Sequence, residues 1–478
     1  MRVAPAAVLA LVLAGCVGPP SAPSGPDGGA ATFDAAAVEA ALGAPLVLDH
    51  DHTRGSLHAG AFNVDFVAWS SLGVTLGENG FANFVFWNST GEQLAFVAID
   101  GDATGGGFVV ADVRDPRHIV PLGRYQVKGS GIQEVRAFPD GSRVVMNVQE
   151  LPSAGVLTDV QGLQDCGVCL HVVNVEDRAQ PRLESVIPVA VVGSHNMEIA
   201  TYGNDVYVFY VGQLTGHPKE PVGNEVNIAR LVQTPLGWQL VKVAEYRHAQ
   251  AAAEVGLSFP HDVVVTEHPL TQQRIAWVSH WAGGAITVDV TDPLAPRELS
   301  VLADPAPSEV VDIHWYAPEP RPRGERLIAW SAPEIRTLGS GTGVVRAYDA
   351  TDPAAVQQLG TWELPGDLVI PGQFLFSPHI TQPDPERGLL AVSHYHAGVW
   401  VLDITNPERP RALGYYLPHG DPAQPYDGPI WWKKPNFDPD GFLPNVYQAR
   451  WKDGLLWVTE RGTGLYVLDY TGPVPGPV

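Results

Sequence analysis

A short phrase recurs six times along this chain of 478 residues, and it constrains the fold more than any other feature. Each copy closes a run of β-branched and apolar residues. The copies begin at Asp112, Asn174, Asp289, Asp349, Asp403 and Asp469. Consecutive copies lie 54 to 66 residues apart, except for one double step of 115 residues that holds a degenerate copy near Arg230. A repeat of this period indicates an array of supersecondary units that bury apolar faces against one another.

Each unit contains four short strand-like runs. Around Asp289 they read HDVVVTEH, RIAWVSHW, AITVDV and ELSVLA. The Asp or Asn side chain can bond a backbone N–H two residues on, and the Pro that follows in most copies stops the strand. The 50 Gly and 43 Pro suit many tight turns. Four strands per unit predict an all-β, seven-bladed β-propeller. Six or eight blades follow if the degenerate unit is misread.

The two ends of the repeat region predict how the ring closes. The last unit has only NVYQARW, LLWVTE and LYVLDY, whereas the strand-like run Phe62–Trp69 stands alone before the first unit. We expect this early strand to become the outer strand of the last blade, which removes an unpaired sheet edge. The propeller is assigned to residues 60–472, with a tail at 473–478.

The runs VVADV, ITVDV and VWVLDI, each followed by D-P or N-P within a few residues, resemble those of LVIVD-repeat proteins. Those proteins are predicted β-propellers of the bacterial and archaeal cell surface. The resemblance covers residues 60–472. It implies the fold and a surface location, and it brings no catalytic motif.

The N-terminus predicts a lipid anchor. Residues 1–15 have the shape of a secretion signal, and the segment from Leu13 to Cys16 resembles a bacterial lipobox, with cleavage before Cys16 and acylation of its sulfur. An ordinary signal peptide with a chance Cys is the alternative. Residues 16–32 read as a disordered tether, and 33–59 as a short helix and lead-in loop. The expected location is extracytoplasmic, on the outer membrane or surface of a bacterium, because Val17 stands where an Asp would favour inner-membrane retention.

The net charge is −23 and the sequence pI is near 5.0. Both nucleic acid and anionic lipid headgroups would be repelled, so neither is an expected partner. Beyond the membrane held through the acyl anchor, the expected partner is a protein or a glycan, and the expected state is a monomer.

Two cysteines remain after Cys16, and they form the sequence CGVC at Cys166 and Cys169. Outside the cytoplasm we expect a local disulfide between them. A zinc site would need more ligands than His171, and a thioredoxin-like site would need a strand-helix unit.

Histidines recur at matching places in the predicted blades. His195 and His261 open the first strand of blades three and four, and His314 and His379 lie in the first strand of blades five and six. A second set follows the second strand: His280, His394 and His396, with Glu460 in that place in the last blade. First strands line the channel, so both sets are expected at one channel mouth. Converging imidazoles could bind zinc, copper or iron. The alternative is hydrogen-bonded structural histidines.

A long insertion between the last two blades carries the aromatic residues Tyr426, Trp431 and Trp432. The strand order places it at the same mouth as the histidines, so these residues and Glu460 are candidates for ligand binding. The alternative is that the aromatics plug the channel.

Two functions follow, and whether the chain is an enzyme stays open. The first is a surface-anchored binding or scaffold protein that holds a partner or glycan, with or without a metal ion at the channel mouth. The second is a metal-dependent enzyme centred on the histidines. The chain lacks a nucleophile motif, a phosphate loop and a zinc-protease signature, which favours the first.

Overall fold

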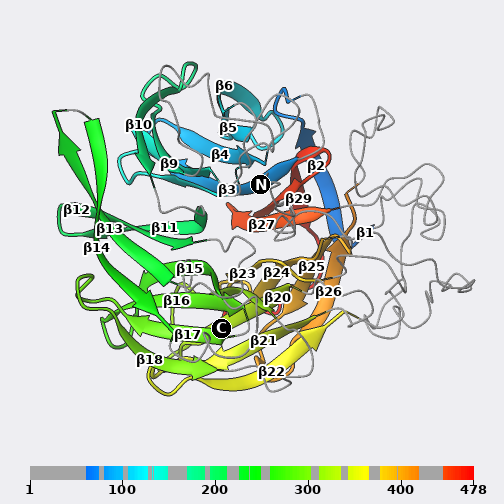
Figure 1. Ribbon diagram of the computed structural model, residues 1–478. Coiled ribbons are helices and arrows are strands. Elements are labelled where there is room, and N and C mark those ends of the chain that lie inside the picture. Colours follow the sequence, from blue (N-terminus) through cyan, green and yellow to red (C-terminus); the bar gives the residue numbers. More distant parts are fainter. Residues whose placement is uncertain are drawn as a thin grey trace, which may run out of the picture.

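Seven small antiparallel sheets stand around a common axis in a computed structural model of the chain (Figure 1). The structure describes residues 61–74, 80–100, 106–127, 132, 134–148, 169–188, 194–212, 225–235, 237–248, 259–281, 283–302, 312–334, 343–364, 377–395, 397–418 and 445–478. Within these ranges the chain forms strands and no helix. The all-β class and the seven-bladed propeller are therefore confirmed.

The first four blades each take four consecutive strands, ordered from the axis outward. Blade 1 is β3 (Phe81–Asn88), β4 (Gln93–Ile99), β5 (Gly106–Asp112) and β6 (Val120–Val127). Blade 2 is β7 (Val135–Ala137), β8 (Arg143–Val148), β9 (Cys169–Asn174) and β10 (Arg182–Pro188). Blade 3 is β11 (Ser194–Tyr202), β12 (Asp205–Gly212), β13 (Glu225–Thr234) and β14 (Gly237–Arg247). Blade 4 is β15 (Phe259–Glu267), β16 (Arg274–Trp281), β17 (Gly284–Asp289) and β18 (Arg297–Leu302).

The last three blades follow the same plan, with additions from the N-terminal segment. Blade 5 is β19 (Asp312–Pro318), β20 (Ile328–Glu334), β21 (Val344–Asp349) and β22 (Gln357–Glu363). Blade 6 is β23 (Thr381–Asp384), β24 (Leu389–Ser393), β25 (Val399–Asp403) and β26 (Arg411–Tyr416), extended by β1 (Ala61–Phe62). Blade 7 is β27 (Val446–Lys452), β28 (Leu455–Glu460), β29 (Gly464–Tyr470) and β2 (Val64–Ser70).

The recurring phrase forms the turn after the third strand of a blade, and its first side chain holds the turn. In five of the six copies a side-chain Oδ1 atom accepts a hydrogen bond from the backbone N–H two residues later, at 2.9 to 3.1 Å. The acceptors are Asp112, Asn174, Asp289, Asp349 and Asp403. This is the local bond that the sequence predicts for Asp and Asn in turns.

The N-terminal strand closes the ring as predicted. β2 pairs antiparallel with β29, from Val64 opposite Tyr470 to Ser70 opposite Leu465. The sequence did not predict β1, which pairs with β26 and so adds a short edge to blade 6. Asn63 lies between β1 and β2 with a φ of 54°, and its Nδ2 atom donates to the carbonyl of Leu413 at 2.7 Å. The N-terminal segment therefore ties blades 6 and 7 together.

Apolar side chains fill the space between neighbouring blades. Between blades 5 and 6, for example, buried residues of both sheets form one cluster that includes Trp330, Leu390 and Trp400. Interdigitated sheet faces of this kind supply most of the stability of an all-β domain. Polar ties add to them: Arg323 of blade 5 binds Glu319 through two nitrogens and also donates to the carbonyl of Ile404 in blade 6 at 2.6 Å.

Several predictions lie outside the described residues. They include the signal peptide, the tether and the short helix in residues 1–60, together with Cys16, Cys166, His396, Tyr426, Trp431 and Trp432. Cys169 is described only as the first backbone position of β9, so the disulfide stays a prediction. In the part of the chain that the structure describes, no helix is long and apolar enough to cross a lipid bilayer.

The C-terminal tail, predicted at residues 473–478, runs back along blade 6. The backbone N–H of Gly476 donates to the carbonyl of Arg387 at 3.2 Å, and that of Val478 donates to the carbonyl of Pro385 at 3.0 Å. The tail therefore contacts the turn between β23 and β24.

Candidate functional site

Four histidine rings meet at the propeller axis, where the innermost strands of blades 3 to 6 begin. The ring centroids of His195 and His261 are 4.2 Å apart, those of His261 and His314 are 4.0 Å apart, and those of His314 and His379 are 3.9 Å apart. All four residues are buried, with at most 1% of each exposed. The structure thus brings together the first set of predicted histidines. We call His195, His261, His314 and His379 the axial histidine cluster.

Irregular strand pairing turns these side chains toward the axis. The register shifts between Ser194 and Met197, between Pro260 and Asp262, and between Ile313 and Trp315, which are the intervals that hold His195, His261 and His314. A β-bulge inserts an extra residue, bends the strand and redirects one side chain. The repeated bulge therefore gives three neighbouring blades the same inward-pointing position. His379 reaches the axis from the residues just before β23.

Backbone carbonyls fix the protonation of two of the rings. His314 Nδ1 lies 2.9 Å from the carbonyl of His379, and His379 Nδ1 lies 2.6 Å from the carbonyl of Tyr447. Because a carbonyl only accepts, each Nδ1 carries the proton, and in the neutral ring Nε2 presents its lone pair. Burial, with a smaller contribution from His314, holds the pKa of His379 well below its usual value. Metal-binding histidines in proteins are commonly oriented in this way.

A buried carboxylate faces the cluster from blade 5. Glu334, at the end of β20, is 1% exposed, and its Oε2 atom lies 4.0 Å from His261 Nε2. The hydroxyl of Tyr395 donates to Glu334 Oε1 at 2.9 Å, which orients the carboxylate. Tyr395 has a φ of 34°, a conformation that bulky residues rarely adopt. Strained residues of this kind are concentrated at functional sites.

Aromatic and charged residues enclose the cluster. Trp281 stacks on His261 with ring centroids 4.7 Å apart, and Tyr447 lies 4.2 Å from His379. On the side of blade 7, the guanidinium of Arg461 lies 4.9 Å from the Tyr447 ring centroid and forms a buried ion pair with Asp100 of blade 1. These contacts hold the rings in place and keep the cluster away from bulk water.

Three residues of the site have the geometry to hold a metal ion. The candidate ligand atoms of His261, His314 and Glu334 all lie within 4.8 Å of one another, and all three residues are buried. His195 Nε2 lies 2.7 Å from His261 Nε2, so its ring faces the same space. Two imidazoles and a carboxylate are a common ligand set for zinc and for non-haem iron. The donor types and their burial fit such an ion.

The second predicted set does not join the cluster. His280 and His394 lie at the same end of the blades, but their rings point between blades: His280 lies 5.7 Å from the ring of His248 of blade 3, and His394 lies 6.3 Å from Trp362 of blade 5. Successive side chains of a strand point to opposite faces. The residue after each histidine, Trp281 or Tyr395, therefore turns toward the axial histidines instead.

Glu460, a candidate for ligand binding, forms its hydrogen bonds within its own blade. Its Oε1 atom accepts from the backbone N–H of Asn445 at 2.8 Å, and its Oε2 atom accepts from the Thr463 hydroxyl at 2.5 Å. Burial raises the pKa of this carboxyl to about 7. Its neighbour Arg461 is the residue that reaches toward the axis.

The packing of His280 predicts a dependence of stability on pH. Burial lowers the pKa of His280 to about 4, whereas in the unfolded chain it is about 6.5. The unfolded state therefore binds more protons between these values, and stability falls as the pH drops from 6.5 toward 4. The variant His280→Gln has no titrating group at this position. Its free energy of unfolding should therefore fall by about 2–3 kcal/mol less than that of the wild type between pH 7.5 and pH 4.5. Urea unfolding at both pH values measures this, and equal losses in the two proteins would refute the buried neutral ring.

Glu334, Tyr395 and Tyr447 were not predicted from the sequence. A signal was present, because aligning the second strands of blades 4 to 7 places Trp281, Glu334, Tyr395 and Arg461 in one column. These four are the residues that surround the axial histidines. The histidines one position earlier, His280 and His394, were predicted as site residues instead.

No protein-family model matches this chain, and no curated protein matches it significantly. Among solved structures, Raptor from Chaetomium thermophilum is similar with a TM-score of 0.52 and 13% sequence identity, covering 88% of this chain. The match spans only 30% of the Raptor chain. Sqt1 from Saccharomyces cerevisiae has a TM-score of 0.47 and 9% identity, with 83% of each chain covered. At such low identity the likeness to Raptor supports the β-propeller fold alone.

Proposed function

We propose that this propeller is a binding protein that holds one transition metal ion at the axial histidine cluster. The observation that carries the proposal is the group formed by His261, His314 and Glu334, whose ligand atoms lie within 4.8 Å of one another in a buried site. A fold of this type is consistent with a binding or scaffold role. The metal would link blades 4 and 5 at the centre of the ring.

The roles of the residues follow from their hydrogen bonds. His314 would bind through Nε2, because its Nδ1–H is held by the carbonyl of His379. Glu334 would bind through Oε2, because Oε1 accepts from Tyr395. His195 is the candidate fourth ligand: the two Nε2 atoms of His195 and His261, 2.7 Å apart, share one proton when no ion is bound, and a cation can take the place of that proton.

The ligand set narrows the choice of metal. Two imidazoles and one carboxylate suit zinc or iron(II), and a third imidazole from His195 keeps copper among the candidates. Calcium and magnesium are disfavoured, because both prefer an environment of oxygen ligands.

Metal analysis of protein purified without a polyhistidine tag tests the proposal. After incubation with zinc, iron(II) or copper(II) and dialysis, the wild type should retain about one equivalent of one metal, and the double variant His261→Ala/His314→Ala should retain none. His280→Gln is the matched control, because it removes a buried histidine outside the cluster and should keep the metal. A wild type without metal, or a double variant that retains it, would refute the proposed site.

One observation favours a second function, a metal-dependent enzyme. The group of His261, His314 and Glu334 supplies three protein ligands, and a metal with three protein ligands keeps a position for water or substrate. Such an ion could activate water or polarise a carbonyl group. The metal-loaded wild type and the double variant His261→Ala/His314→Ala distinguish the two functions. An enzyme should convert a substrate when the metal is bound and should lose this activity in the variant without metal.

The location that we propose rests on the N-terminal sequence and on the resemblance to LVIVD-repeat proteins. The segment from Leu13 to Cys16 supports a lipoprotein signal, with Cys16 as the acylated residue and the cell envelope as the site of attachment. The protein would present the propeller outside the cytoplasm, on the outer membrane or cell surface, to a protein or glycan. Under this proposal, a chain that begins after residue 60 should be found in the soluble fraction rather than with membranes.

A further inference from the structure

A second site lies in the same central channel, toward the opposite end of the blades. It is a cavity of about 670 Å³ that the innermost strands of all seven blades line. Its lining residues come later in these strands than the axial histidines: Trp315 follows His314, and Thr381 lies two residues after His379. Innermost strands run in the same direction around the axis, so the cavity opens away from the cluster. Its volume is in the range of pockets for small molecules.

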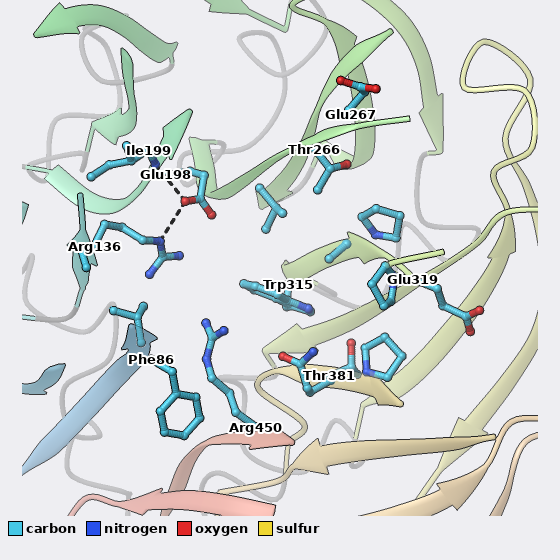
Figure 2. Close-up of a pocket in the computed structure, with 18 of the residues that line it drawn as sticks. Phe86, Arg136, Glu198, Ile199, Thr266, Glu267, Trp315, Glu319, Thr381 and Arg450 are labelled. Carbon is cyan, nitrogen blue, oxygen red and sulfur yellow. Dashed lines mark hydrogen bonds and ion pairs between the residues drawn. The ribbon is translucent and has the colours of Figure 1, made fainter. Parts of the chain in front are cut away.

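Three polar side chains of the cavity wall have atoms with no hydrogen-bond partner among the described residues. They are the indole Nε1 of Trp315, the hydroxyl of Thr381 and the Nε of Arg450. Trp315 is 7% exposed and Thr381 is 1% exposed. A buried polar group without a partner costs about 1–3 kcal/mol. Because blades 5, 6 and 7 are neighbours, the three groups lie on one side of the cavity (Figure 2).

The charge of the cavity wall favours an anion beside Arg450. The other guanidinium, that of Arg136, is paired with Glu134 and with Glu198, whose Oε1 atom lies 3.2 Å from its Nε. Arg450 has no carboxylate of the described residues within ion-pair distance. Figure 2 shows both guanidinium groups pointing into the same space. Burial and the charge of Arg136 lower the pKa of Arg450 to about 10, so it remains a cation at neutral pH.

The rest of the wall is apolar and aromatic. Phe86, Phe138, Ala317, Pro318 and Pro383 all line the cavity. The negative groups of the wall are Glu198, which Arg136 neutralises, Glu319, which Arg323 neutralises, and Glu267, which is exposed at the rim. An apolar wall with a few convergent donors is the usual form of a small-molecule site.

We propose that this cavity binds a small organic carboxylate with an apolar or aromatic body. The carboxylate would accept hydrogen bonds from Arg450, from Trp315 Nε1 and from the hydroxyl of Thr381. Charge-assisted bonds from a guanidinium to a carboxylate are among the strongest in proteins. The body of the ligand would contact Phe86, Phe138 and the proline side chains. This site is separate from the metal proposal, because none of its donors belongs to the axial histidine cluster.

Isothermal titration calorimetry with benzoate and 3-phenylpropionate tests the proposal. Benzyl alcohol is the neutral probe of similar shape, and inorganic phosphate is the anion without an apolar body. We expect at least one of the two carboxylates to bind the wild type. Arg450→Gln should weaken that binding more than about 10-fold, which corresponds to the loss of a hydrogen bond to a charged group. Trp315→Phe, which keeps the aromatic ring and removes the Nε1–H, should weaken it by about 5-fold or more.

The control is Arg114→Gln, which removes an exposed arginine paired with Asp112 in blade 1 and should bind as the wild type does. Circular dichroism confirms that each variant is folded before titration. Three results with the wild type would overturn the proposal. They are no binding of either carboxylate at concentrations up to about 10 mM, binding of benzyl alcohol as tight as that of the carboxylates, and binding of phosphate as tight as that of the carboxylates. Unchanged affinity in a folded Arg450→Gln protein would do the same.

Discussion

Deleting residues 1–70 is expected to prevent this chain from forming a stable propeller, whereas deleting residues 1–60 should leave the ring closed. The first deletion removes β1 and β2, and the second keeps both strands. The pair differs by only ten residues, so it separates the contribution of β1 and β2 from that of residues 1–60.

The size of the effect follows from what β2 contributes. Six residue pairs join β2 to β29, and each backbone hydrogen bond contributes about 0.5–1.5 kcal/mol net. β2 also buries Val64 and Ala68 against the core. Together these amount to roughly 5 kcal/mol or more, which is comparable to the whole stability of a typical domain. The exposed edge of β29 would also promote aggregation.

Circular dichroism melts and gel filtration of the two truncated proteins measure this difference. The protein that begins at residue 61 should melt cooperatively as a monomer, and the protein that begins at residue 71 should aggregate or melt at a much lower temperature. Melting temperatures within about 2 °C of each other would mean that β2 does not hold the ring shut. The longer protein also lacks Cys16, so its location in cells tests the proposed anchor.

Replacing Glu334 by Gln is expected to reduce affinity for the metal by more than about 100-fold. Loss of a residue that only supports a metal ligand typically costs about 10–100-fold in affinity, and Glu334→Gln removes a charged ligand itself. The substitution keeps the size and shape of the side chain. Tyr395→Phe removes only the hydrogen bond that orients the carboxylate, so its expected loss is about 10-fold to 100-fold. The order of the two effects distinguishes a ligand from the residue that positions it.

Competition titrations with a chromophoric zinc chelator measure these affinities. Glu460→Gln is the matched control, because Glu460 is a buried carboxyl at the end of β28, as Glu334 is at the end of β20, and it bonds within its own blade. Its metal affinity should equal that of the wild type. Equal losses in Glu334→Gln and Glu460→Gln would show that any buried charge change disturbs the site, and would remove Glu334 from the ligand set.

The sequence predicted the fold in some detail because its signals are local. Asp289 and its counterparts terminate a strand through a bond to a backbone N–H two residues away, and such a bond depends only on nearby residues. The closing strand was predicted from a count of strands. The last unit had only three strand-like runs, and the run Phe62–Trp69 had no partner strand in its own part of the sequence. β1 was not predicted, because two residues carry no periodic pattern.

The site could be predicted only in part, because it depends on which way single side chains point. His195, His261, His314 and His379 reach the axis because bulges and irregular strand starts redirect them, and a sequence does not show where a bulge falls. In the second strand, a shift of one residue exchanges the two faces. That shift explains why His280 and His394 were predicted at the site, whereas Trp281 and Tyr395 surround it.

Anomalous X-ray scattering from crystals of the metal-loaded protein locates the ion itself, and so decides whether the axial histidine cluster is a metal site. We expect one strong peak on the propeller axis, about 2.0–2.2 Å from His261 Nε2, His314 Nε2 and a Glu334 oxygen. Crystals with no peak among these three residues, or with peaks only at the surface of the propeller, would contradict the proposed site.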